Sequence, residues 1–128
     1  MTIATFISEN EHGSGRHRVQ WQFPGFVIDC VAIDLSFGQK IIDFVAHTRA
    51  NPAFRDVSVA PGTYWYIPEK SIDLSSHFDD LNFEMHKIGE YDHAYLIKVS
   101  RGLQLKVIFE LHEQELDHFL YGLREYTK

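Results

Sequence analysis

Three residues in the middle of the chain have the types and spacing for acid–base chemistry. Glu84 and His86 stand two residues apart in a stretch where apolar residues alternate with polar ones. A strand places such alternate residues on one face, so both side chains are expected on the face away from the core. Asp92 follows the next turn signal and is a candidate neighbour of His86 across a hairpin. A carboxylate beside a histidine orients the ring and raises its pKa, as a general base requires, although such pairs also occur as ordinary cross-strand contacts.

Eight histidines prompt a search for a metal site. Glu115 and His118 have the Glu-x-x-His spacing of a di-iron ligand pair, and His112 stands one turn earlier. A di-iron bundle needs four facing helices, whereas only two helices are predicted here, so an exposed polar helix face is the expected role. The single cysteine, Cys30, lies in an apolar run and is expected to be a buried side chain. The sequence therefore predicts no metal and no cofactor.

Negative charge is concentrated in one short segment. The chain has a net charge of −6, and residues 69–92 hold seven acidic and two basic residues, while the flanking parts are close to balanced. Such a segment is either a solvated surface that favours solubility or a docking face for a basic partner. The nearby tyrosines of the triplet 64–66 are candidate aromatic anchors. The residues expected to contact a partner are Tyr64, Tyr66, Asp73, Asp79, Asp80, Glu84, Glu90 and Asp92.

The hydrophobic periodicity predicts an α+β fold. Helices are expected from Ser36 to the stop at residues 51–52, with a capping box between Ser36 and Gln39, and over residues 113–126. Strands are expected at residues 2–8, 19–23, 26–35, 64–66, 81–86, 95–99 and 103–110. The last three strands form a meander followed by the C-terminal helix. The expected architecture is an antiparallel sheet with two helices packed on one face, a two-layer sandwich.

A turn at residues 100–102, with the glycine in the left-handed conformation, predicts the register of the last hairpin. Val99 would pair with Leu103, which brings all apolar residues of the hairpin to one face. The opposite face would then carry Leu96 and Ile108 beside charged neighbours. That face is either open or covered by another element. Asp29, which interrupts an apolar strand, is expected to face water.

A length of 128 residues suits a single globular domain over residues 1–128. The N-terminal residues do not resemble a signal peptide and no apolar run approaches a membrane span, so a cytoplasmic protein without a membrane partner is expected. The acidic balance argues against direct binding of nucleic acid. These properties favour a protein-binding inhibitor, most concretely a bacterial immunity protein that neutralises a basic toxin such as a nuclease. Two alternatives stay open. One is a small enzyme or small-molecule binder using Glu84, His86 and Asp92, and the other is a homo-oligomeric accessory protein.

Overall fold

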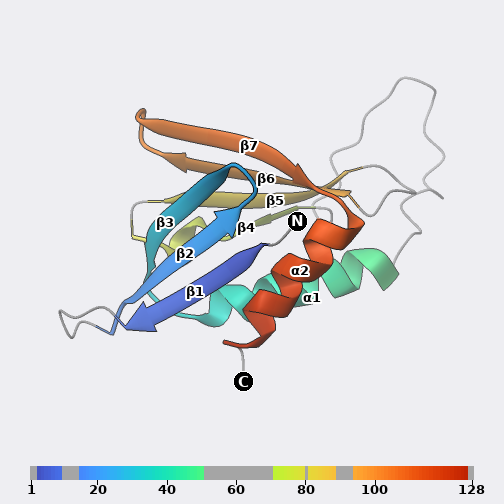
Figure 1. Cartoon of the computed structure of the whole chain (residues 1–128), viewed down its shortest axis with the longest axis horizontal. Helices are drawn as coiled ribbons and strands as arrows, with labels where there is room; N and C mark the ends of the chain where they lie inside the picture. The colour runs from blue at the N-terminus through green and yellow to red at the C-terminus, as the bar shows by residue number, and fades with distance from the viewer. Residues whose placement is uncertain (1–2, 10–14, 51–70, 80, 89–93, 127–128) are drawn as a thin grey trace.

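The computed structural model describes residues 3–9, 15–50, 71–79, 81–88 and 94–126. These residues form two antiparallel sheets and two α-helices (Figure 1). Sheet A has the order β1-β2-β3 and sheet B the order β4-β5-β6-β7. In chain order the elements are β1 (Ala4–Glu9), β2 (His17–Phe23), β3 (Phe26–Ala32), α1 (Ser36–Ala50), β4 (Ser71–Asp73), the 3-10 turn η3 (Ser75–His77), β5 (Asn82–Ile88), β6 (Ala94–Arg101), β7 (Leu105–Leu111) and α2 (Glu113–Arg124).

The predicted α+β class is confirmed, and so is the C-terminal meander of β5, β6 and β7 followed by a helix. The structure differs from the expectation in dividing its strands between two sheets. The sheets meet at the end of β3, where Ala32 forms an isolated bridge with Phe78. Two backbone hydrogen bonds flank the bridge, from Ile33 N to the carbonyl of His77 and from Asp79 N to the carbonyl of Val31. Because the contact is so short, the sheets diverge beyond it and pack their apolar faces around a shared core. The predicted strand at residues 64–66 lies outside the described residues.

Both predicted helix faces are buried. The stripe on α1 consists of Phe37, Ile41, Phe44, Val45 and Thr48, and the stripe on α2 of Leu116, Phe119, Leu120 and Leu123. The helices pack against one another, and α2 also packs on β1 (Figure 1).

The start of α1 is stabilised differently from the predicted capping box. The carboxylate of Asp34 accepts hydrogen bonds from the backbone amide and the hydroxyl of Ser36. Gln39 instead donates to Asp43, at 2.8 Å. A carboxylate placed two residues before the first helical amides satisfies a donor that the helix itself leaves unpaired.

Trp21 on β2 lies at the centre of the core and is fully buried. Its ring packs at centroid distances of 5.4 to 6.0 Å against Phe37 of α1, Phe78 before β5, Phe83 of β5 and Phe119 of α2. One side chain therefore joins sheet A, sheet B and both helices. Its Nε1 atom is buried and finds no hydrogen-bond partner in the described part of the chain, so the contacts seen for this ring are packing contacts.

The register of the last hairpin differs from the prediction by four residues. Val99 pairs with Val107 and Tyr95 with Leu111, and the turn contains Leu103, which is fully exposed. A shift by an even number of residues leaves every side chain on its predicted face. The observed register extends the pairing to Leu111, which is buried, and this burial explains why it is preferred.

We predict that Trp21→Ala lowers the free energy of unfolding by about 3–5 kcal/mol, because it leaves a cavity between both sheets and both helices. Trp21→Phe should cost clearly less. Phe keeps one ring and removes the unpaired N–H, whose burial costs about 1–3 kcal/mol. Urea denaturation followed by circular dichroism measures both. Equal losses for the two variants would contradict the role assigned to this ring.

Candidate functional site

The outer face of sheet B, turned away from the core, carries three of the predicted functional residues, Asp73, Glu84 and His86. One row across the sheet runs through Asp73, Glu84, Lys98 and Ile108, and the next through Ser71, His86, Leu96 and Glu110. Ile108 is half exposed, whereas Leu96 is partly buried. The face is therefore open at its β7 side, with apolar side chains set among charged ones.

The predicted partner-binding residues separate into three groups. Asp73 and Glu84 lie directly opposite one another on β4 and β5. Asp79 lies elsewhere and forms an ion pair of 2.8 Å with Arg16. The others lie outside the described residues, and they are Tyr64, Tyr66, Asp80, Glu90 and Asp92. The structure thus brings two of the predicted acids together on one surface and assigns a third to an ion pair.

The carboxylate of Asp73 is held in place by the turn that follows it. It accepts hydrogen bonds from the amide of Ser75, at 2.9 Å, and from the Ser75 hydroxyl, at 2.5 Å. These bonds lower the pKa of Asp73, so the carboxylate keeps its charge at neutral pH. Like charges directly opposite in a sheet destabilise it by roughly 0.2–1 kcal/mol. Glu84 therefore lies between a carboxylate that Ser75 holds in place, Asp73 on β4, and a basic side chain, Lys98 on β6.

The proposed acid–base group is present only in part. Glu84 and His86 share the outer face of β5, as predicted. The Nε2 atom of His86 is buried and has no hydrogen-bond partner among the described residues. Asp92 lies outside the described residues, so its placement beside His86 stays a prediction.

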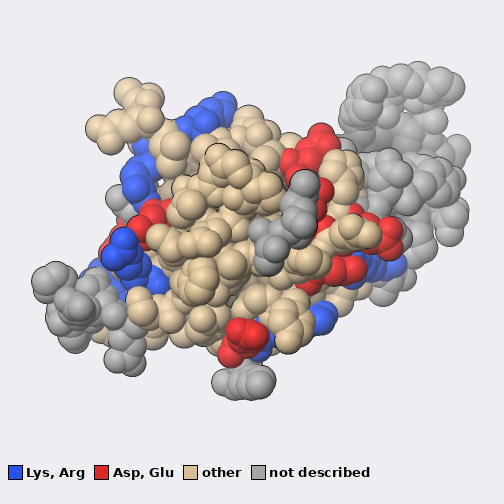
Figure 2. Space-filling view, viewed as in Figure 1, with Lys and Arg blue, Asp and Glu red and all other residues tan. Residues whose placement is uncertain are grey.

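Acidic and basic side chains gather at opposite ends of β7, although residues 93–128 contain equal numbers of the two. Glu110, Glu113 and Glu115 gather where β7 leads into α2, whereas Arg101 and Lys106 flank the β6–β7 turn. In Figure 2 most of the basic side chains in view lie on the upper left and most of the acidic ones on the right, although a few of each kind lie on the other side. Arg18 adds to the basic end and pairs with Asp29, whose pKa it lowers. Asp29 is partly exposed, as the sequence predicts.

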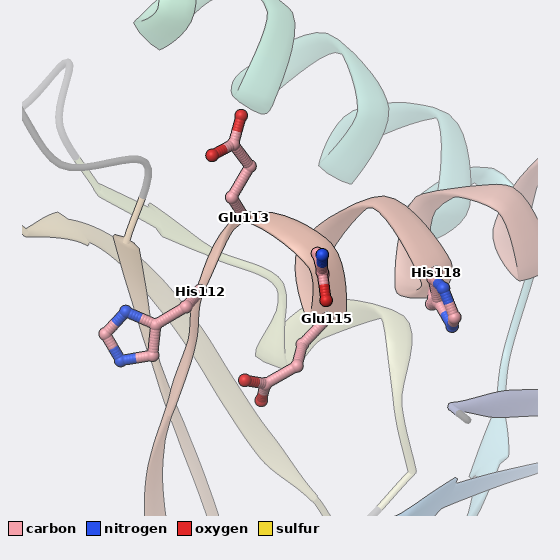
Figure 3. Close-up of a pocket in the computed structure, with 5 residues that line it drawn as sticks. His112, Glu113, Glu115 and His118 are labelled. Atoms are coloured by element: carbon pink, nitrogen blue, oxygen red, sulfur yellow. The ribbon is translucent and has the colours of Figure 1, made fainter. Parts of the chain in front are cut away.

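A cavity of about 480 Å³ lies at the start of α2 (Figure 3). His112, Glu113, Gln114, Glu115 and His118 line it. The side chains of His112 and Glu113 point in different directions, and His118 lies further along the helix. His112 is 3.2 Å from the carboxylate of Glu110. Among the described residues no group of three or more His, Cys, Asp or Glu side chains is arranged to hold a metal ion.

A second polar cluster, which the sequence analysis missed, joins α1 to η3. His77 is buried, with its Nδ1 atom 3.0 Å from Asp34 and its Nε2 atom 2.8 Å from Nζ of Lys40. The Lys40 ammonium group can only donate, so Nε2 accepts and Nδ1 donates to Asp34. Ser36 also lies on the Nδ1 side, at 3.4 Å.

This geometry is not that of a nucleophilic triad. A triad needs the serine and the carboxylate on opposite nitrogens of the histidine. Here both are on one side, and Lys40 occupies the other. The cluster therefore acts as a structural connection between α1 and the seam of the two sheets. His77 lies at least 37 positions along the sequence from each of its partners, so no local motif could have indicated the contact.

No known protein family, curated protein or solved structure matches this chain. Of the helices that the structure describes, none combines the length and the apolar character needed to cross a bilayer.

We predict that Asp34→Ala lowers the free energy of unfolding by about 1 kcal/mol at neutral pH, because it removes a helix cap. The hydrogen bonds from Ser36, followed in importance by His77, lower the pKa of Asp34 in the folded state. This stabilisation is therefore present above the unfolded value of about 3.9 and is lost as the pH falls through the lower folded value.

Urea denaturation of both proteins from neutral pH down to pH values near 2 tests this, because the gap between wild type and Asp34→Ala should close in acid. Asp43→Ala is the matched control, since it removes a carboxylate within α1 whose hydrogen bond is to Gln39 and not to His77. A gap that stays constant with pH would show that the carboxylate charge is not the stabilising feature.

Proposed function

We propose that this protein is a protein-binding inhibitor that docks a basic partner on the outer face of sheet B. The most concrete form is an immunity protein that neutralises a basic toxin, such as a nuclease. The observation that supports it most directly is that Asp73, whose carboxylate Ser75 holds in place, lies directly opposite Glu84 on the outer face of sheet B.

The like-charge pair favours a cationic ligand for a physical reason. Lys98 lies opposite Glu84 on β6, whereas Asp73 on the end strand β4 faces only Glu84 among the described strands. A lysine or arginine of a partner would therefore add an attraction where Asp73 and Glu84 repel one another. The half-exposed Ile108 and the partly buried Leu96 offer apolar area on the same face. Interfaces combine such apolar contacts with a charged rim.

The protein as a whole adds a second, longer-range support. Its net charge of −6 would attract a basic partner before contact. Long-range attraction of this kind raises the rate of association, and salt screens it. The proposal thus predicts an association rate that falls as salt is added.

We expect Asp73→Lys/Glu84→Lys to slow association with the captured basic partner by roughly tenfold at low salt and to flatten its salt dependence. Affinity capture from the native lysate at low and high salt identifies the partner, and stopped-flow mixing of the purified proteins gives the rates. A matched control is Glu113→Lys/Glu125→Lys, which changes the net charge by the same amount at two exposed positions, the start of α2 and the residue after its end. A basic partner whose activity the protein inhibits would support the proposal. Equal rates for all three proteins would remove this face from it.

The alternative of a small enzyme or small-molecule binder has one specific observation in its favour, the buried and unpaired Nε2 of His86 beside Glu84. If no ligand binds this nitrogen, its burial lowers the free energy of unfolding by about 1–3 kcal/mol and no interaction offsets the loss. His86→Leu should then raise the thermal midpoint without loss of partner binding. A ligand that stabilises the wild type and not His86→Leu in a thermal-shift screen would favour the alternative.

A further inference from the structure

Strand β7 forms an end of sheet B, so its outer edge has no partner strand among the described elements (Figure 1). Unpaired edges of this kind present a row of backbone donors and acceptors to another strand. Ile108, at the middle of β7, is half exposed. Lys106 and Glu110, two residues to either side, are exposed on the same outer face.

The sequence of β7 is self-complementary about Ile108. The outward residues are Lys106, Ile108 and Glu110, so the two charges at equal distances from the centre have opposite signs. On the inner face the residues at equal distances are all apolar, with Val107 matching Phe109 and Leu105 matching Leu111. An antiparallel neighbour with the same sequence would therefore meet matched side chains on both faces.

We propose that β7 pairs antiparallel with β7 of a second copy of this chain, in the register that places Ile108 opposite Ile108 of that copy. Lys106 then lies opposite Glu110 of the second copy, and Glu110 opposite its Lys106. The two four-stranded sheets become one continuous eight-stranded sheet. This inference does not rest on the proposed function.

The charges select this register over its neighbours. In a dimer with a two-fold axis perpendicular to the sheet, the outer faces of both copies lie on the same side. Residues of one face must then lie opposite residues of the same face, so the possible registers differ by two residues on the opposing strand. Centring the pair on Lys106 would set two lysines against one another, and centring it on Glu110 would do the same with two glutamates. Centring it on Val107 or Phe109 would place a charge opposite Ile108. The pairing centred on Ile108 alone satisfies both charges of each strand.

The apolar inner row also gains from this pairing. Leu105, Val107 and Phe109 are each only partly buried, although their faces point toward the core. Phe109 already packs on Phe23 and Phe26 of sheet A. A strand added beside β7 would cover the remaining exposed part of this row, and buried apolar area is the main driving force for association.

The first test is a charge exchange, read by analytical ultracentrifugation of the full chain across micromolar concentrations. We expect the wild type to dimerise, and Lys106→Glu and Glu110→Lys each to weaken the dimer at least roughly tenfold, because each replaces two attractive pairs by two repulsive ones. The double variant Lys106→Glu/Glu110→Lys restores opposite charges and should restore the dimer. Glu84→Lys, two strands away, should leave dimerisation unchanged and separates this interface from the proposed docking face.

A wild type that stays monomeric at every concentration would overturn the proposal, and the two edge charges would then serve to prevent strand pairing. A dimer that the single reversals leave unchanged would place the interface elsewhere. Circular dichroism and thermal melting show whether each variant is folded.

Cross-linking tests the register independently of affinity. In the proposed pairing the two Ile108 side chains face one another at a Cβ separation of about 4.5–5.5 Å, which is close enough for a disulfide after a small adjustment. Ile108→Cys should therefore form a covalent dimer under a mild oxidant, whereas Lys106→Cys alone should not. A mixture of Lys106→Cys and Glu110→Cys should cross-link. The native Cys30 is buried and should not interfere. A failure of Ile108→Cys to cross-link while the protein is dimeric would exclude this register.

Discussion

The packing of Trp21 is the contact on which the rest of the structure depends. Its indole touches rings contributed by α1, β5 and α2 and by the segment that leads into β5. Among the described residues the backbones of the two sheets meet at one isolated bridge with two hydrogen bonds, so the backbone alone does little to hold them together. Interdigitated aromatic side chains do so instead, through large buried areas and favourable ring geometry. The packing of these rings around Trp21 thus sets the relative orientation of sheet A, sheet B and the two helices.

Polar contacts then fix the seam that packing has brought together. Asp34, His77 and Lys40 connect the start of α1 to η3, and Arg101 reaches across from β6 to donate to the backbone carbonyl of Asp29, at 2.7 Å. Directional bonds of this kind add modest free energy but exclude other relative positions of the packed elements. The buried position of His77 follows from this role, because its ring is satisfied on both nitrogens.

The same arrangement decides which surface is available for function. The inner faces of both sheets are committed to the core around Trp21, and the helices close it. The outer face of sheet B and the edge of β7 are left to meet other molecules. They carry different chemistry: two acids opposite one another on β4 and β5, and a strand of alternating charged and apolar residues on β7. Because the core is closed, the placement of charge on these surfaces is the property on which both proposals depend.

The sequence by itself determined the class of the fold and the face on which each side chain lies, because periods of 2 and of 3.6 residues are local properties of the chain. Phe37, Ile41 and Val45 on α1 and Phe83 and Met85 on β5 are buried as their spacing predicts. Register was only partly determined: a four-residue shift of β7 against β6 changes no face, and the burial of Leu111 chooses between the alternatives. The division into two sheets, the meeting of Asp34 with His77 and the opposition of Asp73 to Glu84 were decided by tertiary structure. Each depends on contacts between distant segments, and those contacts follow from how the whole apolar surface is buried at once.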